Sequence, residues 1–128
     1  MSVRVVRLGS PRAPDEGMRI GTVRRPPRGV PKEEFATRDF YDAWLPELAP
    51  SADLVAQAQR TETDRDWQAF ERAYRREMSR PEARHLIDLL AALSQRTNLA
   101  VGCYCENESR CHRSMLRELL VEAGAELG

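Results

Sequence analysis

The chain has 128 residues, of which 41% are hydrophobic and 31% charged, and its 20 basic side chains balance 20 acidic ones. This length and composition suit one globular domain, so we expect a single domain over residues 1–128. The apolar runs are far shorter than the roughly 20 residues of a membrane span, and no apolar signal-peptide segment follows Met1. We therefore expect a cytoplasmic protein without a membrane partner, and the neutral net charge argues against generic nucleic-acid binding.

Basic residues are concentrated near the N-terminus. Residues 1–32 contain eight of them against two acidic residues, Asp15 and Glu16, whereas the remainder contains 12 basic and 18 acidic residues. An N-terminal excess of about +6 thus faces a remainder of about −6. This asymmetry predicts internal ion pairs, an anion-binding patch, or both.

Two strands are predicted at the start of the chain. The alternating segment VRVVRL, residues 3–8, is the first, and MRIGTVR, residues 18–24, is the second. Pro26 and Pro27 stop the second strand, and Gly29 adds backbone freedom just after Arg28. Residues 24–29 therefore form a stiffened, basic loop at the carboxyl end of a strand.

Helices are predicted in the middle of the chain. Residues 31–50 mix aromatic and charged side chains between prolines, which favours short helical turns that cover the sheet. Ser51 is the expected N-cap of a helix over about 52–60, Thr63 opens a capping box, and Pro81 begins the next helix. An apolar stripe after the capping box is expected to lie in the core rather than to stack on nucleic-acid bases. It consists of Trp67, Phe70, Tyr74 and Met78.

The C-terminal part predicts a strand, a loop and a helix. The apolar run LAVGCYC, residues 99–105, is the strand, and the polar segment ENESR follows it. The helix extends from about Arg110 to Ala123, with Gly124 as a left-handed cap. The order of elements predicts an α/β fold with a small, largely parallel sheet of three to four strands and four to five helices.

This last segment carries the candidate catalytic residues. Ligands of open α/β sheets gather beyond the carboxyl ends of strands, where a helix N-terminus offers free N–H groups and about half a positive charge. A cysteine in the first turn of such a helix has a lowered pKa. Cys111 is therefore the candidate nucleophile and His112 its acid/base partner, although adjacent helix residues diverge by about 100°. The alternative is that Cys111 packs in the core and His112 binds a carbonyl group.

The same end of the sheet is the candidate anion site. Arg24, Arg28 and Arg113 could clamp a phosphate or carboxylate, together with backbone N–H groups of residues 107–113, and Cys105 lies at the strand end beside them. The expected partner is a phosphate-bearing small molecule or a nucleic-acid end. The alternative is that the arginines form ion pairs with acidic residues of low energetic value.

Three cysteines within nine residues argue for reduced thiols rather than structural disulfides. Cys103 and Cys105 are predicted on one side of a strand, with Cys103 as a small core residue, and Cys105 and Cys111 could form a reversible disulfide. The three cysteines and His112 offer four zinc ligands. However, C-x-C on a strand and an adjacent Cys-His pair are not the usual zinc spacing, so we predict no metal and no cofactor.

Three spaced motifs resemble the DUF488 family of small bacterial proteins. They are VRRPPRGV at residues 23–30 followed by Lys32-Glu33, WLPELAPS at residues 44–51, and Trp67-x-x-Phe70-x-x-x-Tyr74-x-x-Glu77. The resemblance extends from about residue 17 to 122, and the CHR segment, residues 111–113, is similar to another branch of the family. Related sequences carry an Asp just before the arginine loop, where this chain has Thr22 and Val23. The resemblance implies a fold and motifs rather than a reaction.

Three functions are consistent with these observations. The first is a small enzyme that binds an anion or phosphate at the strand ends, between the arginine loop and the Cys-His-Arg helix start. The second is a non-catalytic interaction module in which the cysteines are structural. The third is a thiol redox or metal sensor that uses Cys105 and Cys111.

Overall fold

The computed structural model describes all 128 residues and contains one four-stranded sheet in the order β1-β4-β2-β3. All neighbouring strands are parallel, which confirms the predicted small parallel α/β sheet. The strands are β1 (Val3–Arg7), β2 (Met18–Gly21), β3 (Ala43–Trp44) and β4 (Leu99–Cys103). The helices, within the predicted number, are α1 (Ala52–Gln59), α2 (Asp64–Met78), α3 (Pro81–Leu93) and α4 (His112–Glu122).

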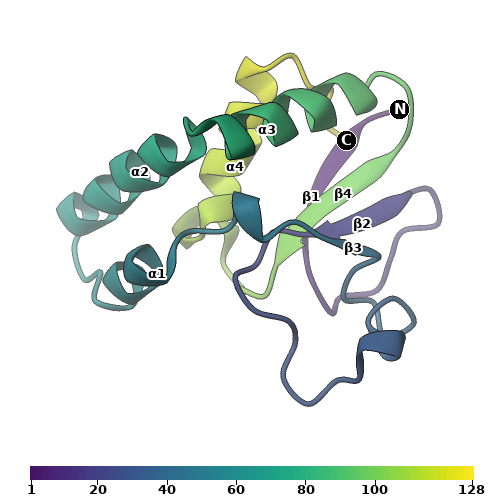
Figure 1. Ribbon diagram of the computed structural model, residues 1–128, viewed down its shortest axis with the longest axis horizontal. Helices are drawn as coiled ribbons and strands as arrows, with labels where there is room; N and C mark the ends of the chain where they lie inside the picture. The colour runs from purple at the N-terminus through teal and green to yellow at the C-terminus, as the bar shows by residue number, and fades with distance from the viewer.

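One face of the sheet packs against the helices. Val101 of β4 is in register with Val5 of β1 and Ile20 of β2, and all three point to the face that α2, α3 and α4 cover (Figure 1). Side chains alternate along a strand, so this register gathers the apolar residues on one side. The main core cluster has 17 buried residues, which come from the sheet, all four helices and the 3₁₀ turn that ends at Leu48. It includes the predicted stripe Trp67, Phe70, Tyr74 and Met78.

Local signals place the helix starts. The Ser51 hydroxyl accepts a hydrogen bond from Leu54 N at 3.2 Å and caps α1. Thr63 and Asp66 form the predicted capping box of α2, and Pro81 is in the first turn of α3. Gly124 follows α4 with a φ of +98°, as expected for a left-handed cap. These predictions are confirmed.

Loop segments cover the other face of the sheet. Arg19 of β2 points to this face and is fully buried, where it binds Glu16 at 2.8 Å and donates to the carbonyl groups of Ser10 and Asp39. Arg12 holds Asp42 in the same region at 2.7 Å. Ion pairing thus accounts for part of the N-terminal basic excess.

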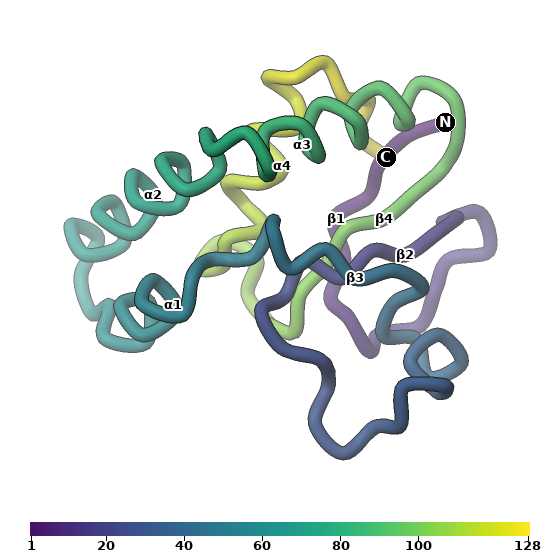
Figure 2. Tube along the Cα trace, in the orientation of Figure 1, coloured from purple at the N-terminus to yellow at the C-terminus, as the bar shows by residue number.

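The long connection between β2 and β3, residues 22–42, first extends away from the sheet and then returns to it at Asp39 and Asp42 (Figure 2). The two chain ends lie next to each other. The ends are joined by a bridge between Val3 and Leu127. None of the helices has the length and apolar character needed to cross a membrane.

The structure corrects four boundaries. β2 ends at Gly21, so residues 22–24 of the predicted second strand belong to the following connection. The connection 31–50 contains the edge strand β3 besides its short 3₁₀ turns, because two residues pair with β2. β4 ends at Cys103, so Cys105 lies in the following loop rather than on the strand. Arg110 belongs to a separate 3₁₀ turn, and α4 begins at His112.

Candidate functional site

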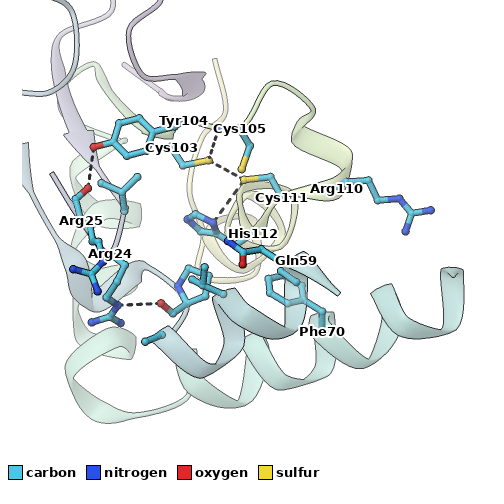
Figure 3. A pocket seen from close by; sticks show the side chains of 15 residues that line it. Arg24, Arg25, Gln59, Phe70, Cys103, Tyr104, Cys105, Arg110, Cys111 and His112 are labelled. Carbon is cyan, nitrogen blue, oxygen red and sulfur yellow. Dashed lines mark hydrogen bonds between the residues drawn. The ribbon is translucent and has the colours of Figure 1, made fainter. Parts of the chain in front are cut away.

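A pocket of about 510 Å³ lies where the carboxyl ends of β2 and β4 meet the start of α4. In a parallel sheet all carboxyl ends share one edge, which is why the arginine loop and the CHR segment meet here. Its lining includes three arginines, all three cysteines and His112, but no Asp or Glu. Figure 3 shows the thiols and the imidazole directed toward one another on one side of the pocket and the Arg24 and Arg25 side chains on the other.

His112 is oriented by the backbone of Thr22, just after β2. Its Nε2 lies 2.8 Å from the carbonyl oxygen of Thr22 and 3.2 Å from Thr22 Oγ1, which donates to Gly102 O. Because a carbonyl only accepts, Nε2 carries the proton and Nδ1 of the neutral ring is left as an acceptor. The buried Tyr74 ring packs against the imidazole, and the centres of the two rings are 5.5 Å apart.

The free Nδ1 of His112 faces Cys111. The distance from Nδ1 to Cys111 Sγ is 3.6 Å, so the predicted partners do meet. They meet because Cys111 is the N-cap of α4 and has an extended backbone (φ −137°, ψ 153°). The prediction that Cys111 lies in the first helical turn is therefore wrong. The 100° step between helix residues therefore does not separate the two side chains.

The three thiols form one cluster. Cys103 Sγ lies 2.8 Å from Cys111 Sγ, and the backbone N–H of Cys105 donates to Cys103 Sγ at 3.4 Å. Cys103 and Cys111 are buried, whereas Cys105 is exposed. The pKa of Cys103 is raised because its thiol donates to Cys105 and Cys111, and burial adds to this effect. Hydrogen bonds from the other thiols lower the pKa of Cys105, and the hydrogen bond with Cys103, together with His112, lowers that of Cys111.

Arg113 supplies a buried positive charge behind the thiols. Its side chain is 3% exposed, and one guanidinium N–H donates to the carbonyl oxygen of Cys105 at 2.6 Å. Its Nε has no hydrogen-bond partner, and no carboxylate pairs with it. A buried cation without a carboxylate needs another negative group nearby. The charge of Arg113 is in turn one of the causes that lower the pKa of Cys105.

The predicted anion residues do not gather in one place. Arg24 lines the pocket, where its Nε donates to Pro50 O at 3.1 Å, but Arg28 lines a neighbouring pocket and Arg113 lies beneath the thiols. Arg25 lines both pockets, and neither it nor Arg24 nor Arg28 forms an ion pair. Arg24 also borders a smaller cavity, whose lining includes glutamates. Arg110 lines the pocket as well, but it binds Asp64 at 2.6 Å.

Two residues of the pocket are not among those that the sequence predicts for the site. Arg25 lies in the same basic loop as the predicted clamp but is not part of it, and Cys103 is predicted only as a core residue. The position of Cys103 as the last residue of β4 is the available signal, because the carboxyl end of that strand faces the helix start.

Cys103, Cys111 and His112 are also the residues that could hold a metal. Their ligand atoms lie within 4.8 Å of one another, and all three residues are buried. Thiolates and imidazole suit Zn²⁺, and a ligating histidine commonly donates its other N–H to a carbonyl, as His112 does to Thr22. However, two thiolates on one zinc ion stand about 3.8 Å apart, given Zn–S bonds of about 2.3 Å. The 2.8 Å between the Cys103 and Cys111 sulfurs is too short for that arrangement.

The fold and site define a small parallel α/β protein with a thiol cluster at the carboxyl end of its central strand. A family model described as the active DUF488-N3 subclade matches residues 3–124. The chain therefore belongs to the DUF488 family, as its motifs indicate. No curated protein and no solved structure matches the chain.

Proposed function

We propose that this chain is a small enzyme that binds a phosphate-bearing ligand, such as a nucleotide or a nucleic-acid end, and attacks it with the thiolate of Cys111. One observation carries the proposal: the Cys111–His112 pair lies in a pocket that three arginines and no carboxylates line. The description of the matching family model as an active subclade agrees with a catalytic site.

The nucleophile is Cys111, and His112 is its general base. In the neutral ring Nδ1 accepts the thiol proton, while Nε2 stays bound to the Thr22 carbonyl. The Cys111 sulfur then bonds to phosphorus, the bond between phosphorus and the leaving group breaks, and the proton on Nδ1 passes to the leaving group. Buried Arg113 stabilises the negative charge that the cluster holds, so its role is to support the thiolate rather than to clamp the substrate.

Arginines of the pocket bind the anionic group. The Nη groups of Arg24 remain free because only its Nε is bound to Pro50, and Arg25 has no acidic partner. Such guanidinium groups are suited to bidentate phosphate binding. The N-terminus of α4 adds its partial positive charge at Cys111. Arg28, in the adjoining pocket, would contact a second charge of a longer ligand.

A titration tests this proposal. Inorganic phosphate and a nucleoside monophosphate are added to labelled protein, and amide NMR shifts are followed, with chloride at equal ionic strength as the control. We expect saturable shifts at Arg24, Arg25 and residues 107–113, together with slower alkylation of Cys111 by iodoacetamide in the bound state. The absence of saturable shifts with both ligands would contradict the proposal.

A reducing compartment such as the cytoplasm would keep the three thiols available as nucleophiles.

A further inference from the structure

We propose that Cys103 is the resolving thiol of Cys111, so that oxidation of Cys111 by a peroxide ends in a reversible Cys103–Cys111 disulfide at the pocket. This activity needs no phosphate-bearing ligand and is independent of the function proposed above. It also replaces the pairing of Cys105 with Cys111 that the sequence alone suggested.

The geometry brings these two sulfurs together before any oxidation. Cys103 ends β4 and Cys111 caps α4, and the loop between them returns the chain so that their Sγ atoms lie 2.8 Å apart. A disulfide bond measures about 2.05 Å, so closure requires a movement of less than about 1 Å. Both side chains pack in one buried cluster with Leu8, Val23 and Tyr41, which holds them in place.

The surroundings also assign different roles to the two thiols. His112 Nδ1 lies 3.6 Å from Cys111, and no imidazole contacts Cys103. His112 can accept the Cys111 proton, whereas Cys103 has no such base beside it, so Cys111 is the thiol that attacks. Cys111 lines the pocket, and a molecule as small as hydrogen peroxide can therefore reach it.

The reaction balances with peroxide as the oxidant. The Cys111 thiolate attacks one peroxide oxygen and the O–O bond breaks, which leaves a sulfenic acid and a hydroxide that takes a proton to become water. The Cys103 sulfur then attacks the Cys111 sulfur, the S–O bond breaks, and the departing hydroxide takes the Cys103 proton. Two thiols thus lose two electrons and two protons, and one peroxide becomes two waters. Because Cys111 is consumed, oxidation also blocks its use as a nucleophile.

Peptide mapping of the native full chain tests the pairing. The protein is treated with one equivalent of hydrogen peroxide, quenched with a maleimide under denaturing conditions, and cleaved after Tyr104 and Arg110. These cleavages place the three cysteines on separate peptides. We expect a disulfide that joins the peptide ending at Tyr104 to the peptide beginning at Cys111, with Cys105 alkylated, and its reversal by dithiothreitol. A Cys105–Cys111 disulfide, oxidation confined to Cys105, or thiols protected by a bound metal would each overturn the proposal.

Two variants sharpen the test. Cys105→Ser should form the same disulfide as the unmodified chain, because Cys105 takes no part in it. Cys103→Ala should instead accumulate sulfenic acid on Cys111, which dimedone traps. The mapping of the unmodified chain decides the question even where a variant does not fold. The disulfide readout is separate from the phosphate titration, so either proposal can fail alone.

Discussion

Nε2 of His112, at the start of α4, lies 2.8 Å from the carbonyl oxygen of Thr22, just after β2. This contact fixes the proton on Nε2 and turns Nδ1 toward Cys111. It depends on the backbone of residue 22, so the side chain at that position need not be ionisable. A carboxylate is therefore not required here to orient the imidazole, although resembling sequences carry an Asp just before the arginine loop.

Replacement of His112 should raise the pKa of the Cys111 thiol. In His112→Phe the ring no longer offers Nδ1, so one of the groups that lower the Cys111 pKa is lost. The pH profile of Cys111 alkylation, measured on the peptide beginning at Cys111, should have its midpoint below the ordinary value of about 8.5 in the unmodified protein. The midpoint should move upward in the variant.

Thr22→Val is the matched control for this change. It removes Oγ1 but keeps the carbonyl that binds Nε2, so the alkylation midpoint should stay close to that of the unmodified protein. An equal shift in both variants would mean that the carbonyl alone does not orient the imidazole and that the hydroxyl is needed as well.

Arg25→Ala should weaken phosphate binding. A charge-assisted hydrogen bond contributes about 1.5 kcal/mol or more, so we expect the Kd for a nucleoside monophosphate to rise roughly 10-fold. Arg28→Ala should have a smaller effect on inorganic phosphate, because Arg28 lines the adjoining pocket. Arg96→Ala, in the exposed turn between α3 and β4, is the control for net charge. If it weakens binding as much as Arg25→Ala, the pocket is not the binding site.

Local signals explain what the sequence predicts well. The capping box at Thr63 and Asp66 lies within one turn, and neighbouring members of the apolar stripe from Trp67 to Met78 are one turn apart; both features are present. The prolines at 26 and 27 likewise predict the basic loop because they remove two N–H donors. Such features need no knowledge of the rest of the chain.

Features that depend on contacts between distant parts of the chain could not be predicted from the sequence. β3 has only two residues and exists through its pairing with β2, so no periodicity marks it. The extended backbone of Cys111, which brings it to His112, occurs where a 3₁₀ turn ends and α4 begins, and no local pattern marks that junction. Arg24 and Arg113 have the same side chain, yet one is exposed and the other buried, and only the packing of the loop decides which.

Glu16→Gln should strongly destabilise the fold. The change leaves the fully buried Arg19 without its ionic partner, and removal of one member of a buried ion pair typically costs about 3–5 kcal/mol. Urea unfolding measures the loss. Asp15→Asn is the matched control, because Asp15 is exposed and its pair with Arg4 should contribute less than about 1 kcal/mol. Equal losses would show that the burial of the pair is unimportant.

The same ion pair predicts acid sensitivity. Burial raises the pKa of Glu16, but the hydrogen bond and charge of Arg19 outweigh it, so the folded-state pKa lies below the ordinary 4.5. The stability from this group is therefore complete above about pH 4.5 and is lost as the pH falls through the lower folded-state pKa. Urea midpoints should decline over this range in the unmodified protein. The decline should be shallower in Glu16→Gln, and an unchanged slope would exclude Glu16 as a cause.

Alanine substitutions at Gly17 and Gly124 distinguish the cost of backbone strain from the cost of a steric collision. Gly17 and Gly124 both have a positive φ, of +83° and +98°, so alanine is strained by about 1–2 kcal/mol at either site. A Cβ at Gly17 would also collide with the backbone carbonyl of Asn98, whereas nothing lies within 4 Å at Gly124. Gly17→Ala should therefore lower the free energy of unfolding by about 3–5 kcal/mol and Gly124→Ala by only the strain. Similar losses in urea unfolding would mean that the segment before β2 can move away from Asn98, in which case the strain alone explains both variants.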